Sequence, residues 1–160
     1  FVTRREGLMM RKDAPVKVHN LSELAASGLR FIGRDRHSGT RILFNLLLRQ
    51  AGLTEKSINR SPQHEFTHTA VAAFVASGMA DVGFGVEAAA SQFNLDFVEM
   101  ASEHYLLLCH EERLGQDNLS HLIELMRSQA FIDRIEHLPG YEPDSPGTIT
   151  TFEQLLAGTG

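Results

Sequence analysis

LRFIGRDRHSGTRILFNLLLRQAG, residues 29–52, joins a short apolar segment to a longer one through a polar loop. Residues 29–32 have the character of a buried strand. Ser38 stands directly before apolar residues at helical spacing, where an N-cap is expected, and Gly52 stands where a helix commonly ends. The stretch therefore predicts a strand over 29–32, a loop over 33–37 and a helix from about 39 to 51.

The alternation of strand and helix continues on both sides of this stretch. Further strands are predicted at 8–10, 16–18, 80–84, 95–98 and 105–109. Further helices are predicted at 21–27 with Asn20 as N-cap, 68–76 with Thr67 as N-cap, 86–92, 118–135 with a break near 128–129, and 151–156 as the last ordered piece. Residues 54–64 are predicted to be a loop with one helical turn. This order is typical of an α/β fold, and we expect a largely parallel sheet.

Composition narrows the classes of function. The formal net charge is −5, whereas a nucleic-acid-binding module presents a basic face, so we expect no direct contact with nucleic acid. No apolar run approaches the roughly 20 residues of a membrane helix, and we expect no membrane partner. The single cysteine, Cys109, excludes an intrachain disulfide and favours a cytoplasmic location. Its apolar neighbours, residues 106–108, predict that it is buried in a strand.

Residues 34–41, RDRHSGTR, are the first candidate for chemistry. They follow a predicted strand and open a predicted helix, whose N-terminus attracts anions through free backbone N–H groups and the helix dipole. Hydroxyl and guanidinium donors would add to that attraction, and Gly39 would let a ligand approach the backbone. The alternative interpretation is a serine N-cap surrounded by three solvated arginines. Spacing alone leaves both open.

Residues 64–68, HEFTH, match the zinc-protease pattern H-E-x-x-H. That chemistry requires His64 and His68 on one helical face, Glu65 beside the metal-bound water, and a further ligand such as Glu87. Thr67 is a better candidate for the N-cap of the helix, which would leave His64 in the preceding loop. The chain also lacks the G-x-S-x-G and G-x-G-x-x-G patterns of hydrolases and dinucleotide-binding proteins. We therefore expect no metal, no cofactor and no enzymatic activity from this domain.

Six short motifs occur in an order that resembles a known family. They are residues 5–8, 34–43, 67–73, 77–85, 95–98 and 103–105. Over about residues 4–110, the chain resembles the periplasmic-binding-protein-like domain of bacterial cytoplasmic proteins. In that family the domain is attached to a winged helix-turn-helix related to molybdate-responsive regulators, or to the molybdopterin-biosynthesis protein MoeA.

The resemblance implies a type II periplasmic-binding-protein fold, an α/β fold with two lobes. We expect the domain to span residues 1–142, with lobe II at about 18–97. Residues 1–17 and 98–142 would supply the crossing strands and part of lobe I, and 143–160 would be a C-terminal tail. The chain would then hold one near-complete lobe and part of the second, without the N-terminal segment of lobe I. A homodimer that covers the exposed lobe I surface is a further expectation.

The resemblance also implies a ligand. Tungstate-binding proteins of transport systems carry similar Ser-Gly-Thr segments with an arginine four residues before the serine, which Arg34 and Ser38 match. We expect a small anion: molybdate, tungstate or a molecule related to molybdenum cofactor. His37 departs from the family, which more often has glycine there, and could add a pH-dependent donor. The expected ligand-binding residues are Arg34, Arg36, Ser38, Gly39, Thr40, Arg41, Thr67, His68 and Tyr105.

Three functions follow from these patterns. The leading interpretation is a sensor domain whose closure on the anion is passed to a fused helix-turn-helix or MoeA domain outside this chain. The second is the solute-binding component of an oxyanion transporter. The third is a zinc hydrolase using His64, Glu65 and His68.

Overall fold

The computed structural model describes residues 1–157 and divides into two compact units. The larger unit is Arg4–Glu103, and the smaller unit combines Phe1–Thr3 with the residues from His104 on. Two strands, β1 (Val2–Met10) and β4 (Asp96–Tyr105), run from one unit into the other. Within the described residues, no helix is long and apolar enough to cross a membrane.

The sheet has the strand order β2-β3-β1-β4, and a short fifth strand, β5 (Tyr141–Pro143), pairs with β1. The strand β3 (Val82–Val86) runs parallel to β2 (Phe31–Ile32) and antiparallel to β1. The prediction of a largely parallel sheet is therefore wrong, while the α/β class is confirmed. The end of β1 at Met10 and the start of β2 at Phe31 both lie beside Val82, so the connecting segment returns the chain to the same end of the sheet.

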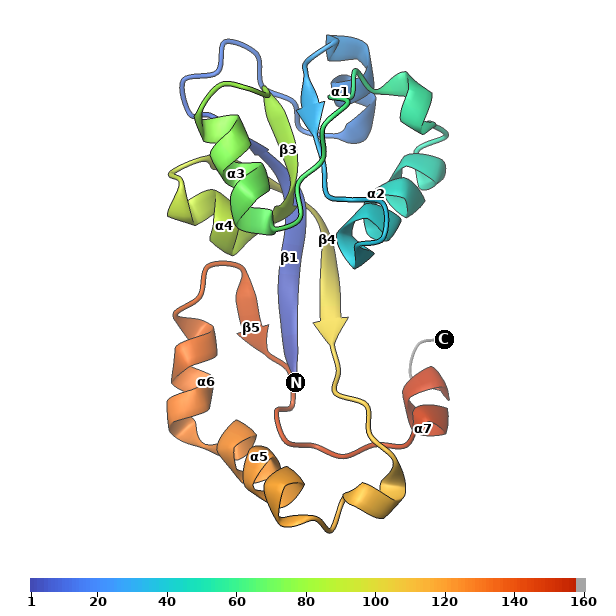
Figure 1. The fold of residues 1–160 in the computed structure, drawn as a ribbon, viewed down its shortest axis with the longest axis vertical. Coiled ribbons are helices and arrows are strands. Elements are labelled where there is room, and N and C mark those ends of the chain that lie inside the picture. Colours follow the sequence, from blue (N-terminus) through green and yellow to red (C-terminus); the bar gives the residue numbers. More distant parts are fainter. Residues whose placement is uncertain (158–160) are drawn as a thin grey trace. The chain divides into compact units, whose positions relative to one another are not determined.

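Helices cover both faces of the sheet in the larger unit (Figure 1). On one face, α1 (Leu21–Ser27) and α2 (Gly39–Gln50) pack against Leu8, Met10 and Phe84 around a stack of Phe31 on Phe44. On the other face, α3 (His68–Ala76) and α4 (Glu87–Gln92) pack against Met9. Alternate residues of β1 thus enter opposite cores, as the period of a strand requires.

The predicted helix starts are confirmed. The side chains of Asn20, Ser38 and Thr67 accept hydrogen bonds from backbone N–H groups in the first turns of α1, α2 and α3. The predicted helical turn after residue 54 is the 3₁₀ helix η1 (Glu55–Ser57).

Several predicted strands are wrong. Residues 16–18 form no strand. The strand expected at 95–98 is longer than predicted and continues as β4 to Tyr105, because a half-exposed strand tolerates the polar residues at 102–104. The separate strand expected at 105–109 does not form. Residues 106–109 are irregular, and Cys109 is exposed rather than buried.

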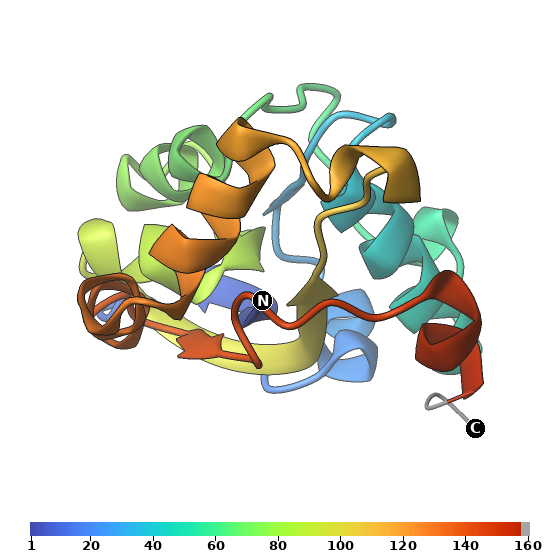
Figure 2. The same cartoon turned by 90° about the horizontal axis from the view of Figure 1, so that it is seen from below.

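The smaller unit contains α5 (Asp117–Arg127) and α6 (Gln129–Glu136), which meet at Ser128. Figure 2 shows α6 nearly end-on while α5 crosses the view, so the two helices meet at a steep angle. The predicted break at 128–129 is confirmed, because Ser128 ends α5 and caps α6. The unit also holds the 3₁₀ helix η2 (Glu111–Arg113), β5 and α7 (Phe152–Ala157).

Gly7 lies where two strands approach each other closely. A Cβ placed there would lie 2.1 Å from the carbonyl oxygen of Val98, so one strand would have to move. We predict that Gly7→Ala lowers the free energy of unfolding by about 2 kcal/mol or more, as overpacking does. Gly39→Ala is the control, since nothing lies within 4 Å of a Cβ there and alanine favours a helix. Urea denaturation of both variants checks this, and equal stabilities would contradict it.

Candidate functional site

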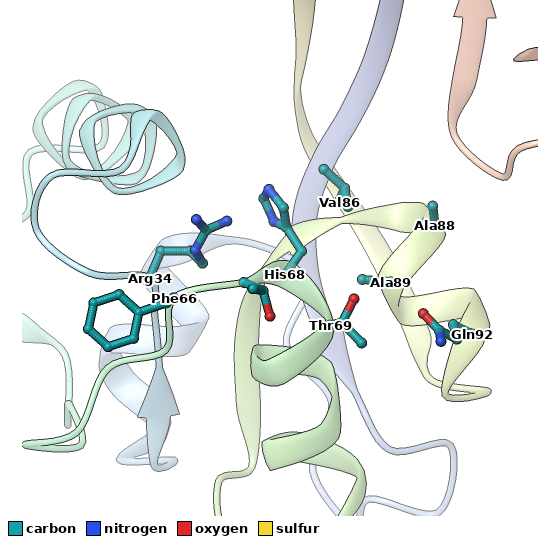
Figure 3. A pocket seen from close by; sticks show the side chains of 9 residues that line it. Arg34, Phe66, His68, Thr69, Val86, Ala88, Ala89 and Gln92 are labelled. Carbon is teal, nitrogen blue, oxygen red and sulfur yellow. The ribbon is translucent and has the colours of Figure 1, made fainter.

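The larger unit carries an open pocket of about 400 Å³ at the N-terminus of α3 (Figure 3). Its lining comes from the loop after β2, the start of α3, the end of β3 and α4. The lining residues are Arg34, Phe66, Thr67, His68, Thr69, Val86, Ala88, Ala89 and Gln92. In the close view, the guanidinium of Arg34 and the imidazole of His68 extend to the same side of the pocket.

Arg34 enters the pocket from a loop that is held at both ends. The backbone of Glu65 donates to the carbonyl of Gly33 at 3.1 Å and accepts from the N–H of Asp35 at 3.1 Å. These bonds pair Arg34 with Glu65 in an isolated parallel bridge. The Nε of Arg34 is buried and has no hydrogen-bond partner in the protein. A buried donor without an acceptor is costly, so an acceptor supplied by a ligand would stabilise this side chain.

His68 is the first residue of α3 and is held neutral. Its Nδ1 is buried without a partner and faces Gly85, where an added Cβ would lie 2.9 Å away. Burial lowers the pKa of His68 to about 3, with further contributions from the positive charges of Arg34 and Arg4. At neutral pH the imidazole is therefore uncharged beside two guanidinium groups.

The polar side chains at the start of α2 form hydrogen bonds and an ion pair with other groups of the protein. Ser38 Oγ accepts from the N–H of Arg41 at 3.2 Å and donates to the carbonyl of Asp35 at 2.9 Å. Thr40, which is buried, donates through Oγ1 to Glu6 Oε1 at 3.1 Å. The guanidinium of Arg41 pairs with the Glu55 carboxylate.

The structure brings only some of the expected site residues together. Arg34, Thr67 and His68 line the pocket. Thr40 and Arg41 pack beside Arg34, together with Phe31, Gly33, Phe44 and Phe84, in a region with no room for a water molecule. Arg36, Ser38 and Gly39 belong neither to the pocket lining nor to this packed group, and the exposed Arg36 donates to His37 at 3.0 Å. Tyr105 belongs to the smaller unit and ends β4.

Sequence reasoning missed a buried charge cluster beside this site. Arg4 donates through Nη2 to Glu6 Oε1 at 2.8 Å and through Nε and Nη2 to Glu103 Oε2 at 2.9 and 2.8 Å. Glu6 is fully buried. Its pKa is raised to about 7, chiefly by burial and then by the Glu103 carboxylate, against the lowering effect of Arg4. A signal existed, because Arg4 and Glu6 stand two residues apart and share one face of a strand.

The two histidines of the zinc-protease pattern, His64 and His68, do not lie on one face of a helix. The helix begins at His68, while His64 and Glu65 lie in the loop before it, with Thr67 as N-cap. Glu87, the further ligand considered, pairs with Arg5 at 2.9 Å. Among residues 1–157, no three His, Cys, Asp or Glu side chains are grouped so as to hold a metal ion.

The pocket thus offers a guanidinium with an unpartnered N–H, the N-terminus of α3 and a neutral imidazole. Positive charge combined with hydrogen-bond donors suits an anion. The model of the PBP superfamily domain matches residues 1–127. The chain belongs to this family.

Relatives of this PBP superfamily chain agree with the fold. Over 150 residues it is 29% identical to YvgK of Bacillus subtilis, covering 92% of this chain and 47% of that protein. The chain thus spans about half the length of this curated relative. Among solved structures, it is similar to a Clostridium perfringens protein described as a phosphate ABC transporter substrate-binding protein with bound phosphate. That match has 15% identity and a TM-score of 0.68, covering 89% of this chain and 70% of that chain.

A second solved structure is the substrate-binding domain of a Clostridium difficile protein described as a molybdenum ABC transporter. It is 18% identical with a TM-score of 0.53, covering 90% of this chain and 65% of that chain. At these identities, the two structures establish the periplasmic-binding-protein-like fold of the chain.

The neutral state of His68 predicts a pH dependence of stability. Its pKa is lower in the folded chain than in the unfolded chain, so the unfolded state takes up an extra proton as the pH falls below about 6.5. Between pH 7 and pH 5, the free energy of unfolding should fall by about 2 kcal/mol more in the wild type than in His68→Gln. Urea denaturation at both pH values measures this difference.

His64→Gln is the matched control, because His64 is exposed and lies four residues away in the preceding loop. It should keep the pH dependence of the wild type. If His68→Gln also keeps it, the neutral buried imidazole is contradicted.

Proposed function

We propose that the pocket at the N-terminus of α3 binds a small oxyanion and that the chain is a ligand-binding domain without catalytic activity. The observation that carries the proposal is Arg34, whose buried Nε has no partner in the protein while its side chain lines the pocket. An oxyanion would accept from this nitrogen and neutralise the guanidinium in one contact.

The surroundings of Arg34 favour the same class of ligand. The first N–H groups of α3 have no acceptors within the helix beyond the Thr67 cap, and the helix dipole places partial positive charge at this end. His68 adds a neutral ring that donates a hydrogen bond through whichever nitrogen carries its proton. We infer that Arg34 supplies the charge and that Thr67, Thr69 and His68 orient the anion.

We propose a tetrahedral oxyanion of the molybdate and tungstate type as the ligand. Two similar structures support this class of ligand: one has bound phosphate, and the other is described as the substrate-binding domain of a molybdenum transporter. The sequence resemblance, with Arg34 four residues before Ser38, supports the same class. In the structure Ser38 acts as a helix cap, so we assign it no direct contact with the anion.

We propose the role of a cytoplasmic sensor domain that passes anion binding to a fused regulatory or MoeA domain. The alternative is the solute-binding component of an oxyanion transporter, which the transporter descriptions of both similar structures support. In both roles the domain binds and releases its ligand without breaking a bond.

Titration calorimetry with tungstate, molybdate, phosphate and sulfate tests the proposed ligand class. We predict that the wild-type chain binds at least one of these anions and that Arg34→Ala weakens binding about 10- to 100-fold, the effect of losing a charge-assisted hydrogen bond. The matched control is Arg36→Ala, which removes an exposed arginine of the same loop that does not line the pocket.

Arg36→Ala should change the affinity less than about twofold, as expected for an exposed charge. Absence of binding by the wild type, or equal losses in both variants, would contradict the assignment to Arg34.

A further inference from the structure

The strands β1 and β4 hold a cluster of one buried carboxylate, one partly buried carboxylate and one guanidinium. Glu6 is 0% exposed, and its Oε1 accepts from Arg4 and from Thr40. Arg4 also donates twice to Oε2 of Glu103. The side chains of Arg4 and Glu103 are 11% and 24% exposed, so little solvent screens these charges.

The cluster lacks one positive charge. Two carboxylates against one guanidinium leave a net charge of −1, which is costly in a buried position. The second oxygen of Glu6, Oε2, is buried and has no donor. The Glu103 carboxylate, also an acceptor, interacts with the Glu6 carboxyl group, and a proton on Glu6 would let the two groups form a hydrogen bond. One bound proton therefore neutralises the cluster and satisfies the orphaned oxygen.

The cluster is linked to the anion pocket by two residues. Thr40, which donates to Glu6, packs in the same region as Arg34, a lining residue of the anion pocket. Arg4, which holds both carboxylates, is also close enough to His68 to lower its pKa. A negative charge placed beside Arg34 and His68 therefore makes the electrostatic potential at Glu6 more negative. A more negative potential favours the protonated form of the Glu6 carboxyl.

We propose that Glu6 and Glu103 share a single proton and that anion binding in the pocket is linked to retention of this proton, with Glu6 as the positioning residue that connects the two sites through Thr40. The linkage rests on the proposed function, whereas the shared proton stands on the cluster itself. By reciprocity, the anion raises the affinity for the proton by the same factor as the proton raises the affinity for the anion.

The groups that face Glu6 fix the direction of the effect. Arg4 faces it from β1, Glu103 from β4 and the uncharged Thr40 from α2. His68 of α3 and Arg34 line the pocket, and Arg4 is close enough to His68 to lower its pKa. The pKa of Glu6 is raised to about 7, so deprotonation on going from pH 6 to pH 8.5 adds a negative charge to the cluster. Anion affinity should then fall as the pH rises.

The experiment is calorimetric titration of the wild-type chain and Glu6→Gln with tungstate between pH 6 and pH 8.5. Tungstate is kept dilute enough to stay monomeric; the monomer keeps its charge over this range, so any change arises in the protein. Glutamine keeps an acceptor for Thr40 and imitates the protonated carboxyl. We predict that the wild-type Kd rises about threefold or more over the range. For Glu6→Gln it should stay within about 1.5-fold, at the low-pH wild-type value.

The matched control is Glu99→Gln, an exposed glutamate of β4, which should behave as the wild type. A wild-type Kd that does not change with pH, or an equal change in Glu6→Gln, would overturn the linkage.

Carbon-13 NMR of the glutamate carboxyls tests the shared proton without a ligand. We expect one resonance that titrates near pH 7 in the wild type and is absent from Glu6→Gln. If no such resonance appears, the shared proton is wrong. If tungstate does not bind the wild type at any pH, the proposed function and the linkage both fail, and the NMR result decides the shared proton alone.

Discussion

The Arg4 guanidinium is bound to two carboxylates from different strands, Glu6 of β1 and Glu103 of β4, and much of the larger unit depends on this contact. The guanidinium compensates the negative charge of the buried Glu6 carboxylate, which would be strongly destabilising without a positive partner. It also ties together two strands that approach closely at Gly7. Through Thr40 it holds the first turn of α2, and by its charge it helps to keep His68 neutral. The packing of β1 and the electrostatics of the pocket therefore have a common origin.

The pocket itself combines one unsatisfied cation with neutral donors. A protonated His68 would add positive charge, but burial and the nearby arginines disfavour it, so Arg34 remains the charged group that lines the pocket. Its Nε has no acceptor within the protein, which costs free energy. An anion that supplied an acceptor would recover this free energy on binding. The same reasoning separates Arg34 from Arg36, which is exposed and donates to its neighbour His37.

Local signals in the sequence predicted most of the helices and part of the site. The caps at Asn20, Ser38 and Thr67 are formed by contacts within one turn, so spacing alone was enough to locate them. Strand direction was not predictable, because it depends on where the chain returns after α1. Residues 106–109 look like a buried strand but lie exposed, since apolar composition does not supply a strand partner. The Glu6 cluster was missed because Glu103 stands 99 residues after Arg4, and only the fold brings the two together.

The central claim is that Arg34 and the N-terminus of α3 hold an oxyanion. Anomalous X-ray scattering from crystals of this chain grown with tungstate tests it most directly, because tungsten locates the anion without any assumption about the site. We predict one strong peak about 4 Å from the Arg34 guanidinium, within reach of Thr67 and His68. A peak at the exposed Arg36 and Ser38, or no ordered tungsten in the larger unit, would contradict the account.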